Sequence, residues 1–186
     1  MYRGRIEVIT GCMFSGKSEE LVRLLRRARI AQKTVKAFKH ASDDRYHTAK
    51  IGGHPGADGN PGVTFDAHPL KTIAAIERNA RGHDVIGIDE AQFFGLDLVD
   101  FCERWANLGV RVIVAGLDLD SSGKPFGPIP GLMAIAETVT KLHAVCIQCG
   151  EPANRSYHLA GKVEQIEVGA SQYEARCRGC WYDATG

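Results

Sequence analysis

The residues from Gly11 to Ser18 match the phosphate-binding pattern G-x-x-x-x-G-K-S/T. In such a loop the backbone N–H groups and the positive end of the following helix face a phosphate chain, while Lys17 reaches its β and γ oxygens and Ser18 ligates Mg²⁺. The pattern needs a strand before it and a helix after it. Arg5–Thr10 is β-rich, and Ser18–Ala31 carries apolar residues at helical spacing. We therefore expect a nucleoside triphosphate with Mg²⁺ at Gly11, Cys12, Met13, Phe14, Ser15, Gly16, Lys17 and Ser18.

Two adjacent acids, Asp89 and Glu90, follow the apolar run Val85–Ile88. A carboxylate at the end of a buried strand beside a phosphate loop can reach the metal directly or through water, which makes Asp89 a candidate Mg²⁺ ligand. Successive residues of an extended chain point to opposite sides, so Glu90 can instead face a phosphoryl acceptor. A solvated pair of acids is the alternative reading, and it is weak for both residues beside such a loop.

Four of the six cysteines form two C-x-x-C pairs, and four thiolates are the number that a closed tetrahedral Zn²⁺ site takes. Such a site leaves no open position, so we expect a structural metal that ties the base of the loop between the pairs. Disulfides are the alternative, but the cysteines are unevenly placed and no export signal accompanies them. The expected ligands are Cys146, Cys149, Cys177 and Cys180.

The composition is that of a globular chain of 186 residues, with 44% hydrophobic and 24% charged residues and a net charge of +1. This balance argues against a general polyanion binder, so we expect no nucleic-acid partner. The longest apolar stretch, Val112–Leu117, is far shorter than the ~20 residues that a bilayer requires. The amino terminus enters a strand-like run without the apolar segment of a signal peptide, and we expect a cytoplasmic location and no membrane partner.

Strand-like and helix-like segments alternate along the first three quarters of the chain, which predicts an α/β fold with a mostly parallel sheet flanked by helices. The glycine- and proline-rich stretch Ser42–Val63 is read as a long loop. After His143 the pattern changes to a cysteine-bounded segment, so we expect a nucleotide-binding domain over 1–143 and a metal-stapled domain over 144–186. The expected strands are Arg5–Thr10, Thr34–Phe38, Val85–Ile88 and Val110–Leu117, and the expected helices are Ser18–Ala31, Pro69–Ala80, Leu98–Leu108 and Leu132–Leu142.

These motifs leave three classes of function open: a small-molecule kinase, a regulatory ATPase and a zinc-bearing nucleic-acid module. The run Asp89-Glu90-Ala91-Gln92 echoes helicase sequences, but a helicase motor needs more residues than this chain has.

Several motifs in one order carry a family resemblance over nearly the whole chain. They are Gly11–Ser18, Asp43–Tyr46, Asp89–Phe94, Gly116–Asp118, Lys124–Phe126, the two cysteine pairs and Val168–Tyr173. In these the chain resembles the thymidine kinases of the cytosolic, zinc-containing class. The resemblance implies a P-loop fold that transfers the γ-phosphoryl group of ATP to the 5′-hydroxyl of thymidine, with Mg²⁺ on the phosphates. It also implies a structural Zn²⁺ that ties a lasso loop over the base.

The resemblance also assigns roles to single residues. It makes Glu90 the base that faces the 5′-hydroxyl, places Arg45 near the 5′ end and Asp43 near the sugar, and adds Asp89 and Gln92 to the ATP site. It further implies a homotetramer and inhibition by thymidine triphosphate. The implied nucleoside pocket consists of Met13, Phe93, Leu117, Phe126, Ser156, Val168, Gly169, Ala170 and Tyr173.

The chain departs from the family pattern at two positions that matter for the site. The family usually has proline or serine at the position of Cys12, whose side chain we expect to point away from the phosphates. It usually has phenylalanine at the position of Ser121. One aromatic wall of the pocket is therefore either missing or supplied from elsewhere.

Overall fold

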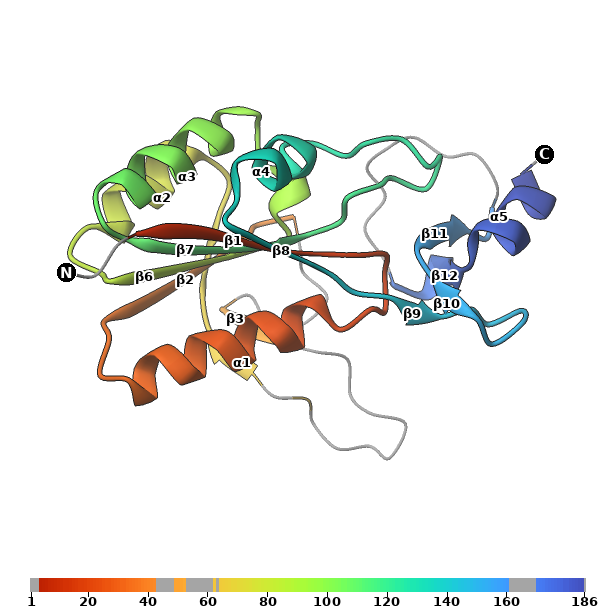
Figure 1. Ribbon diagram of the computed structural model, residues 1–186, viewed down its shortest axis with the longest axis horizontal. Coiled ribbons are helices and arrows are strands. Elements are labelled where there is room, and N and C mark those ends of the chain that lie inside the picture. The colour runs from red at the N-terminus through yellow and green to blue at the C-terminus, as the bar shows by residue number, and fades with distance from the viewer. Residues whose placement is uncertain (1–3, 43–48, 53–61, 63, 161–169, 186) are drawn as a thin grey trace.

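A six-stranded parallel sheet forms the centre of the larger part of the molecule (Figure 1). The computed structural model describes residues 4–42, 49–52, 62, 64–160 and 170–185. All neighbouring strands of this sheet are parallel, in the order β5-β2-β6-β7-β1-β8. The expected α/β class with a parallel sheet is confirmed. The strands are β1 (Arg5–Thr10), β2 (Val35–His40), β5 (His68–Leu70), β6 (Val85–Asp89), β7 (Arg111–Gly116) and β8 (Thr138–Lys141).

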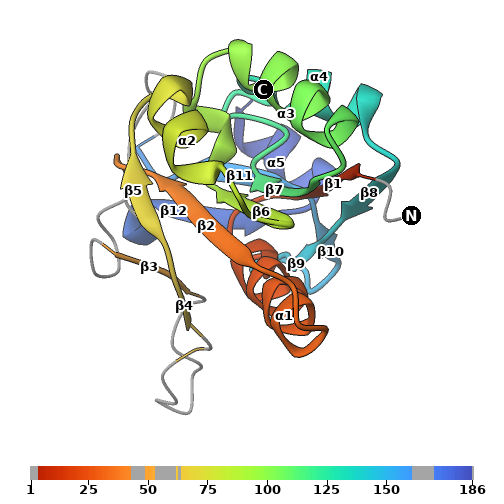
Figure 2. The same cartoon turned by 90° about the vertical axis from the view of Figure 1, so that its left-hand side faces the viewer.

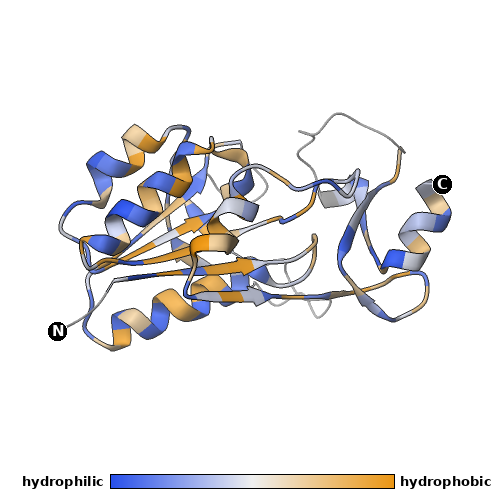
Figure 3. Cartoon of the chain, turned by 45° about the horizontal axis from the view of Figure 1, so that its top comes forward, coloured by the Kyte–Doolittle hydropathy of each residue, from blue (hydrophilic) through white to orange (hydrophobic). Residues whose placement is uncertain are grey.

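Helices cover both faces of this sheet, with α1 on one face and α2, α3 and α4 on the other (Figures 1 and 2). Because side chains alternate along a strand, Val112 and Val114 of β7 pack into the core under α2 to α4, whereas Ile113 packs toward α1. Figure 3 shows the apolar strands between the helical layers. The helices are α1 (Lys17–Ile30), α2 (Ile73–Ala80), α3 (Asp97–Asn107) and α4 (Ile129–Ile135), with a 3-10 turn, η1, at Ala91–Phe93.

The helix expected over Pro69–Ala80 is wrong in its first turn. Residues His68–Leu70 form the edge strand β5, which pairs with β2, and the helix begins only at Ile73. Thr72 is extended, and its hydroxyl accepts a hydrogen bond from the N–H of Ala75 at 3.3 Å, which caps the helix. Proline is tolerated in an edge strand, because its missing N–H can face away from the ladder.

The helix expected over Leu132–Leu142 is half wrong as well. Helix α4 ends at Ile135, and β8 then pairs with β1 at the edge of the sheet. Its β-branched residues Thr138, Val139 and Thr140 favour this extended state. The spacing of apolar residues in this segment does not show that β1 is available as its pairing partner.

The stretch Ser42–Val63, read as a loop, contains the strand β3 (Lys50–Gly52). This strand pairs with β4 (Thr64–Asp66) in an antiparallel ladder. Ile51 and Phe65 are buried in the core beneath α1, so a short hairpin extends that core. Residues 43–48, 53–61 and 63 lie outside the described part of the chain.

The cysteine-bearing part consists of two small antiparallel ladders and a terminal helix (Figure 1). A buried cluster of Cys12, Ala144, Cys146, Ala153 and Ala175 joins this part to the phosphate loop. The division of the chain at residue 143 therefore stays a prediction. In the described residues no helix is both long and apolar enough to cross a membrane. The elements are β9 (Ala144–Val145), β10 (Pro152–Ala153), β11 (Arg155–His158), η2 (Ala170–Gln172), β12 (Tyr173–Arg176) and α5 (Arg178–Thr185).

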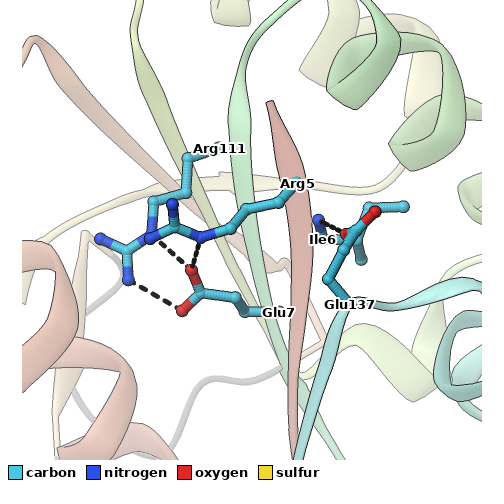
Figure 4. Close-up of polar contacts among 5 residues, drawn as sticks. All are labelled: Arg5, Ile6, Glu7, Arg111 and Glu137. Carbon is cyan, nitrogen blue, oxygen red and sulfur yellow. Dashed lines mark hydrogen bonds and ion pairs between the residues drawn. The ribbon is translucent and has the colours of Figure 1, made fainter. Parts of the chain in front are cut away.

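Polar contacts fix the two strands next to β1 at the end of the sheet opposite the phosphate loop (Figure 4). On one side Glu7 of β1 accepts hydrogen bonds from Arg5 and, at 2.7 and 2.8 Å, from Arg111 of β7. On the other side Glu137, just before β8, accepts from the N–H of Ile6 at 2.6 Å. Burial acts to raise the pKa of Glu7, but its hydrogen bonds to Arg111 and Arg5 and their charges hold this pKa below its ordinary value.

This ion pair predicts a pH-dependent stability. Glu7→Gln removes the charge that pairs with both arginines, so the free energy of unfolding at neutral pH should fall by about 1–3 kcal/mol. A carboxyl whose folded pKa is lowered stabilises above its unfolded pKa, and this contribution is lost as pH falls through the folded pKa. The difference between Glu7→Gln and wild type should therefore shrink in acid. Urea unfolding at about pH 7 and about pH 3 measures it.

Glu20→Gln is the matched control, because Glu20 pairs with the exposed Arg23 within one helix. Its effect on unfolding should stay within about 0.5 kcal/mol. An equal loss of stability in both variants would mean that the strand-to-strand pair contributes no more than a surface pair.

Candidate functional site

The phosphate loop leaves the carboxyl end of β1 and enters α1, as the sequence pattern predicts. Gly11 has φ 145°, and a Cβ built there would lie 2.3 Å from the carbonyl oxygen of Leu142, so the position requires glycine. Gly16 has φ 83° and precedes the first turn of α1, whose N–H groups are oriented toward an incoming anion. The Nζ of Lys17 donates to the carbonyl oxygen of Cys12 at 2.8 Å, so the ammonium group lies over the loop.

Ser18 and Asp89 meet at the base of this loop, although 71 positions separate them in the sequence. The hydroxyl of Ser18 donates to Oδ2 of Asp89 at 2.9 Å, and Asp89 is only 4% exposed. A hydroxyl and a carboxylate are the oxygen donors that Mg²⁺ accepts in nucleotide sites. The two residues therefore fit a Mg²⁺ ion between the loop and β6.

Glu90 leaves the direction of β6, because its backbone adopts a left-handed conformation with φ 52°. Its Oε2 accepts a hydrogen bond of 2.5 Å from the side-chain amide of Gln92, and the carbonyl oxygen of that amide accepts from the N–H of Leu117 at 3.0 Å. Gln92 is buried, so this amide links the Glu90 carboxylate to the end of β7. Gln92 was expected in the ATP site; its side chain lies between Glu90 and Leu117.

Aromatic side chains gather beside Glu90. Phe93 and Phe126 lie edge to face with ring centroids 5.8 Å apart, and Phe94 belongs to the core instead. His40, at the carboxyl end of β2, contacts Phe94 with ring centroids 4.7 Å apart. Burial and the charge of Lys71 lower the pKa of His40, which Glu90 opposes. The sequence analysis missed His40, because β2 extends two residues beyond the strand expected there.

The cysteine-bearing part contributes directly to the phosphate loop. The N–H of Met13 donates to the hydroxyl of Ser156 at 3.0 Å, and the thiol of Cys12 donates to the carbonyl oxygen of Ala153 at 3.3 Å. Cys12 is buried in the cluster shared with that part, and burial raises the pKa of its thiol. Tyr173 pairs with His158 across β11 and β12, and their ring centroids lie 4.8 Å apart.

Some of the expected site residues lie outside the described part of the chain. These are Asp43, Arg45, Val168 and Gly169, while Ala170 is described only as the first residue of η2. The described residues nevertheless bring the phosphate loop, Asp89 and Glu90 to one end of the sheet, and of the residues expected in the nucleoside pocket Met13 contacts Ser156 and Phe93 contacts Phe126.

An open depression of about 410 Å³ lies beside the phosphate loop. Phe14 belongs to the loop, is 44% exposed and has a left-handed backbone conformation with φ 65°. Strands β9 and β12 supply most of the remaining wall. The lining residues are Phe14, Ala144, Val145, Ile147, Tyr173, Glu174 and Ala175.

The four paired cysteines form one cluster, with all sulfur atoms within 4.8 Å of one another. The sulfur atoms of Cys149 and Cys177 are 3.7 Å apart, which fits the spacing of about 3.8 Å that two Zn–S bonds of ~2.3 Å impose in a tetrahedron. Burial acts to raise the pKa of Cys146, but hydrogen bonds from backbone N–H groups, first that of Cys177, bring it to about 6. The four thiols can therefore hold one thiophilic metal ion.

Trp181 is a residue of this region that the sequence analysis did not identify. It follows Cys180 in α5, and its indole N–H donates to the carbonyl oxygen of Ser121 at 3.3 Å. An aromatic side chain thus lies at the backbone of the turn where Ser121 departs from the family pattern.

Comparison with known proteins agrees with this arrangement. The family model described as "Thymidine kinase" matches residues 4–181. A thymidine kinase of Bacteroides fragilis is 47% identical over 98% of this chain and 89% of its own length. Those of Rhodothermus sp. and Bdellovibrio bacteriovorus are 49% and 47% identical over 96% and 95% of this chain, and 81% and 84% of their own lengths. The chain therefore belongs to the thymidine kinase family.

Proposed function

We propose that this protein transfers the γ-phosphoryl group of ATP to the 5′-hydroxyl of thymidine, giving thymidine monophosphate. The observation that carries the proposal is the placement of Glu90 beside the Ser18–Asp89 pair and the edge-to-face Phe93–Phe126 rings. A carboxylate between a phosphate site and a flat apolar site can serve an acceptor hydroxyl. Membership of the thymidine kinase family supports nucleoside as the acceptor.

The phosphate loop binds the triphosphate through its backbone N–H groups, and Lys17 exchanges the carbonyl oxygen of Cys12 for phosphate oxygens. Ser18 and Asp89 would hold Mg²⁺. Mg²⁺ bound there would neutralise phosphate charge during the transfer. The loop thus orients the γ-phosphoryl group toward the acceptor.

Glu90 accepts the proton of the acceptor hydroxyl, and Gln92 is its positioning residue. The amide of Gln92 donates to the carboxylate and thereby fixes its orientation. Arg45 near the 5′ end and Asp43 near the sugar complete this proposal, on the strength of the family motif that contains them.

The thymine base occupies the pocket beside Phe93 and Phe126, with Met13, Leu117 and Ser156 at its margin and Tyr173 on β12. The family motif that contains residues 168–170 assigns them to the lasso over the base. In this proposal Zn²⁺ on the four thiolates holds the two ends of that loop and takes no part in the transfer, because four protein ligands leave no open position. Inhibition by thymidine triphosphate, a homotetramer and a cytoplasmic location belong to the same proposal.

Glu90→Gln separates a kinase from an ATPase that only binds and hydrolyses nucleotide. We expect the turnover of thymidine phosphorylation to fall by about 10²–10⁴-fold, which is what a positioned general base typically contributes. ATP affinity should persist, because the phosphate loop is unchanged. Labelled phosphate transfer from ATP to thymidine and equilibrium ATP binding measure the two effects. Glu103→Gln, on an exposed position of α3, should behave as wild type, and near-normal turnover of Glu90→Gln would remove Glu90 from the mechanism.

Gln92→Glu tests the positioning role through the pH profile. The variant places two carboxylates at hydrogen-bond distance, and such a pair binds a proton more readily than a single carboxylate does, because like charges repel. The acid limb of kcat/KM should therefore move to higher pH. Gln92→Met adds no charge, so it should shift the acid limb of the kcat/KM profile less than Gln92→Glu does. A Gln92→Glu profile that superimposes on wild type would show that the amide does not govern Glu90.

Removal of the metal should weaken thymidine binding rather than ATP binding. A loop whose ends are released must be ordered again on binding, and that conformational entropy raises the thymidine KM. Elemental analysis should give about one Zn per chain in the wild type and loss of metal in Cys177→Ser. Cys102→Ala is the control, because Cys102 lies in the core away from the cluster and the variant should retain the metal. Unchanged thymidine affinity without metal, or tight nucleic-acid binding, would contradict the lasso role.

A further inference from the structure

Trp181 lies between the four-cysteine cluster and a turn that leads into the proposed nucleoside pocket. Its backbone N–H donates to the carbonyl oxygen of Cys177 at 3.0 Å, within the turn that carries Cys177 and Cys180. Its indole N–H donates to the carbonyl oxygen of Ser121 at 3.3 Å, 60 positions earlier in the chain. One residue is therefore bonded to both regions.

The turn that receives the indole is stiff. The buried carboxylate of Asp120 accepts from the N–H groups of Ser122 and Lys124, each at 2.9 Å, and Asp120 and Lys124 are also joined through their backbones. Gly123 has φ 75° and lies against the indole, since a Cβ built there would be 3.1 Å from Cη2 of Trp181. The turn from Asp120 to Lys124 should therefore move as a rigid unit together with the indole of Trp181.

The same turn sets the position of Phe126. A backbone bridge joins Leu119 to Pro125, and the N–H of Phe126 donates to the carbonyl oxygen of Asp118 at 3.0 Å. Phe126 is buried and contacts Phe93 edge to face. A displacement of the turn is thus transmitted over two residues to the aromatic pair beside Glu90.

The indole of Trp181 also lies near strand β11. The guanidinium of the buried Arg155 lies 5.9 Å from the centroid of the Trp181 ring, and the next residue, Ser156, accepts from the N–H of Met13 in the phosphate loop. Trp181 therefore contacts the turn on one side and approaches strand β11 on the other.

We propose that Trp181 is a positioning residue that couples metal occupancy of the cysteine cluster to the geometry of the nucleoside pocket. The metal fixes the Cys177–Cys180 turn, this turn orients Trp181, and the indole holds the Ser121–Gly123 backbone so that Phe126 faces the base. The inference rests on the proposed function for the identity of the nucleoside. In this proposal Trp181 of α5 supports the turn that contains Ser121, the position where the family usually has phenylalanine.

This coupling predicts a change in thymidine KM without a matching change in kcat or in the KM for ATP. Trp181→Phe keeps a ring against Gly123 and loses the bond to Ser121, so its thymidine KM should rise roughly two- to tenfold, as expected for one lost hydrogen bond. Trp181→Ala also loses the packing and should raise it further. Both kcat and the KM for ATP should stay within about twofold, because the bond to Ser121 contributes to substrate binding rather than to the transfer step.

Tyr182→Ala is the matched control, because Tyr182 is the next residue of α5 and is 68% exposed. It should leave all three constants unchanged. Wild-type thymidine KM in Trp181→Ala would overturn the proposal, and so would an equal loss in kcat and in ATP binding, which would indicate general unfolding.

Tryptophan fluorescence tests the metal step without thymidine. Removal of Zn²⁺ from the wild type by a chelator should change the emission, and readdition of Zn²⁺ should restore it. In Trp181→Phe, which retains only Trp105, the change should vanish. An identical change in both proteins, or none in the wild type, would overturn the coupling. If the wild type failed to phosphorylate thymidine, the proposed function would fail, whereas this fluorescence result would still decide the link between metal and Trp181.

Discussion

The parallel direction of the strands is the constraint on which the rest of the site depends. Parallel neighbours present their carboxyl ends at one edge, where ligands bind in open α/β sheets. Here β1 delivers the phosphate loop, β6 delivers Asp89 and Glu90, and β7 delivers Leu117. The Ser18–Asp89 hydrogen bond joins two of these ends, and Gln92 joins Glu90 to the third. The placement of Glu90 relative to the phosphate loop thus follows from buried strands.

The second part of the chain is built onto the phosphate loop rather than beside it. Cys12 belongs to the loop by sequence but to the small core of the cysteine-bearing part by packing, and Met13 bonds to Ser156. Proline at position 12 would lack the thiol that donates to Ala153. A change in either part can therefore reach the other through these two consecutive residues of the loop, as well as through the contact of Trp181 with Ser121.

Local spacing was sufficient for the features that consecutive residues define. The phosphate loop, each cysteine pair and strand β7, which is buried on both faces, can each be recognised within about ten residues of sequence. Other features depend on contacts between residues far apart in the sequence, which the local spacing of apolar residues does not reveal. Residues 138–141 are a strand because β1 offers an unpaired edge, and the contacts of Gln92 with Leu117 and of Trp181 with Ser121 link positions 25 and 60 apart. Gln92 and Leu117 lie in motifs that carry the family resemblance and Trp181 lies in none, but neither contact can be read from the sequence, so only the fold reveals them.

The two candidate metal sites of this chain differ in their donor atoms. The cysteine cluster offers sulfur, which a hard cation such as Mg²⁺ does not favour, while Ser18 and Asp89 offer oxygen. A metal ion bound at either site would therefore not readily move to the other. Because the sulfur site is closed, its influence on the reaction must pass through protein contacts. One described route from the cluster to the aromatic pair runs through Trp181, the Asp120–Lys124 turn and Phe126, and it consists of hydrogen bonds and a ring contact.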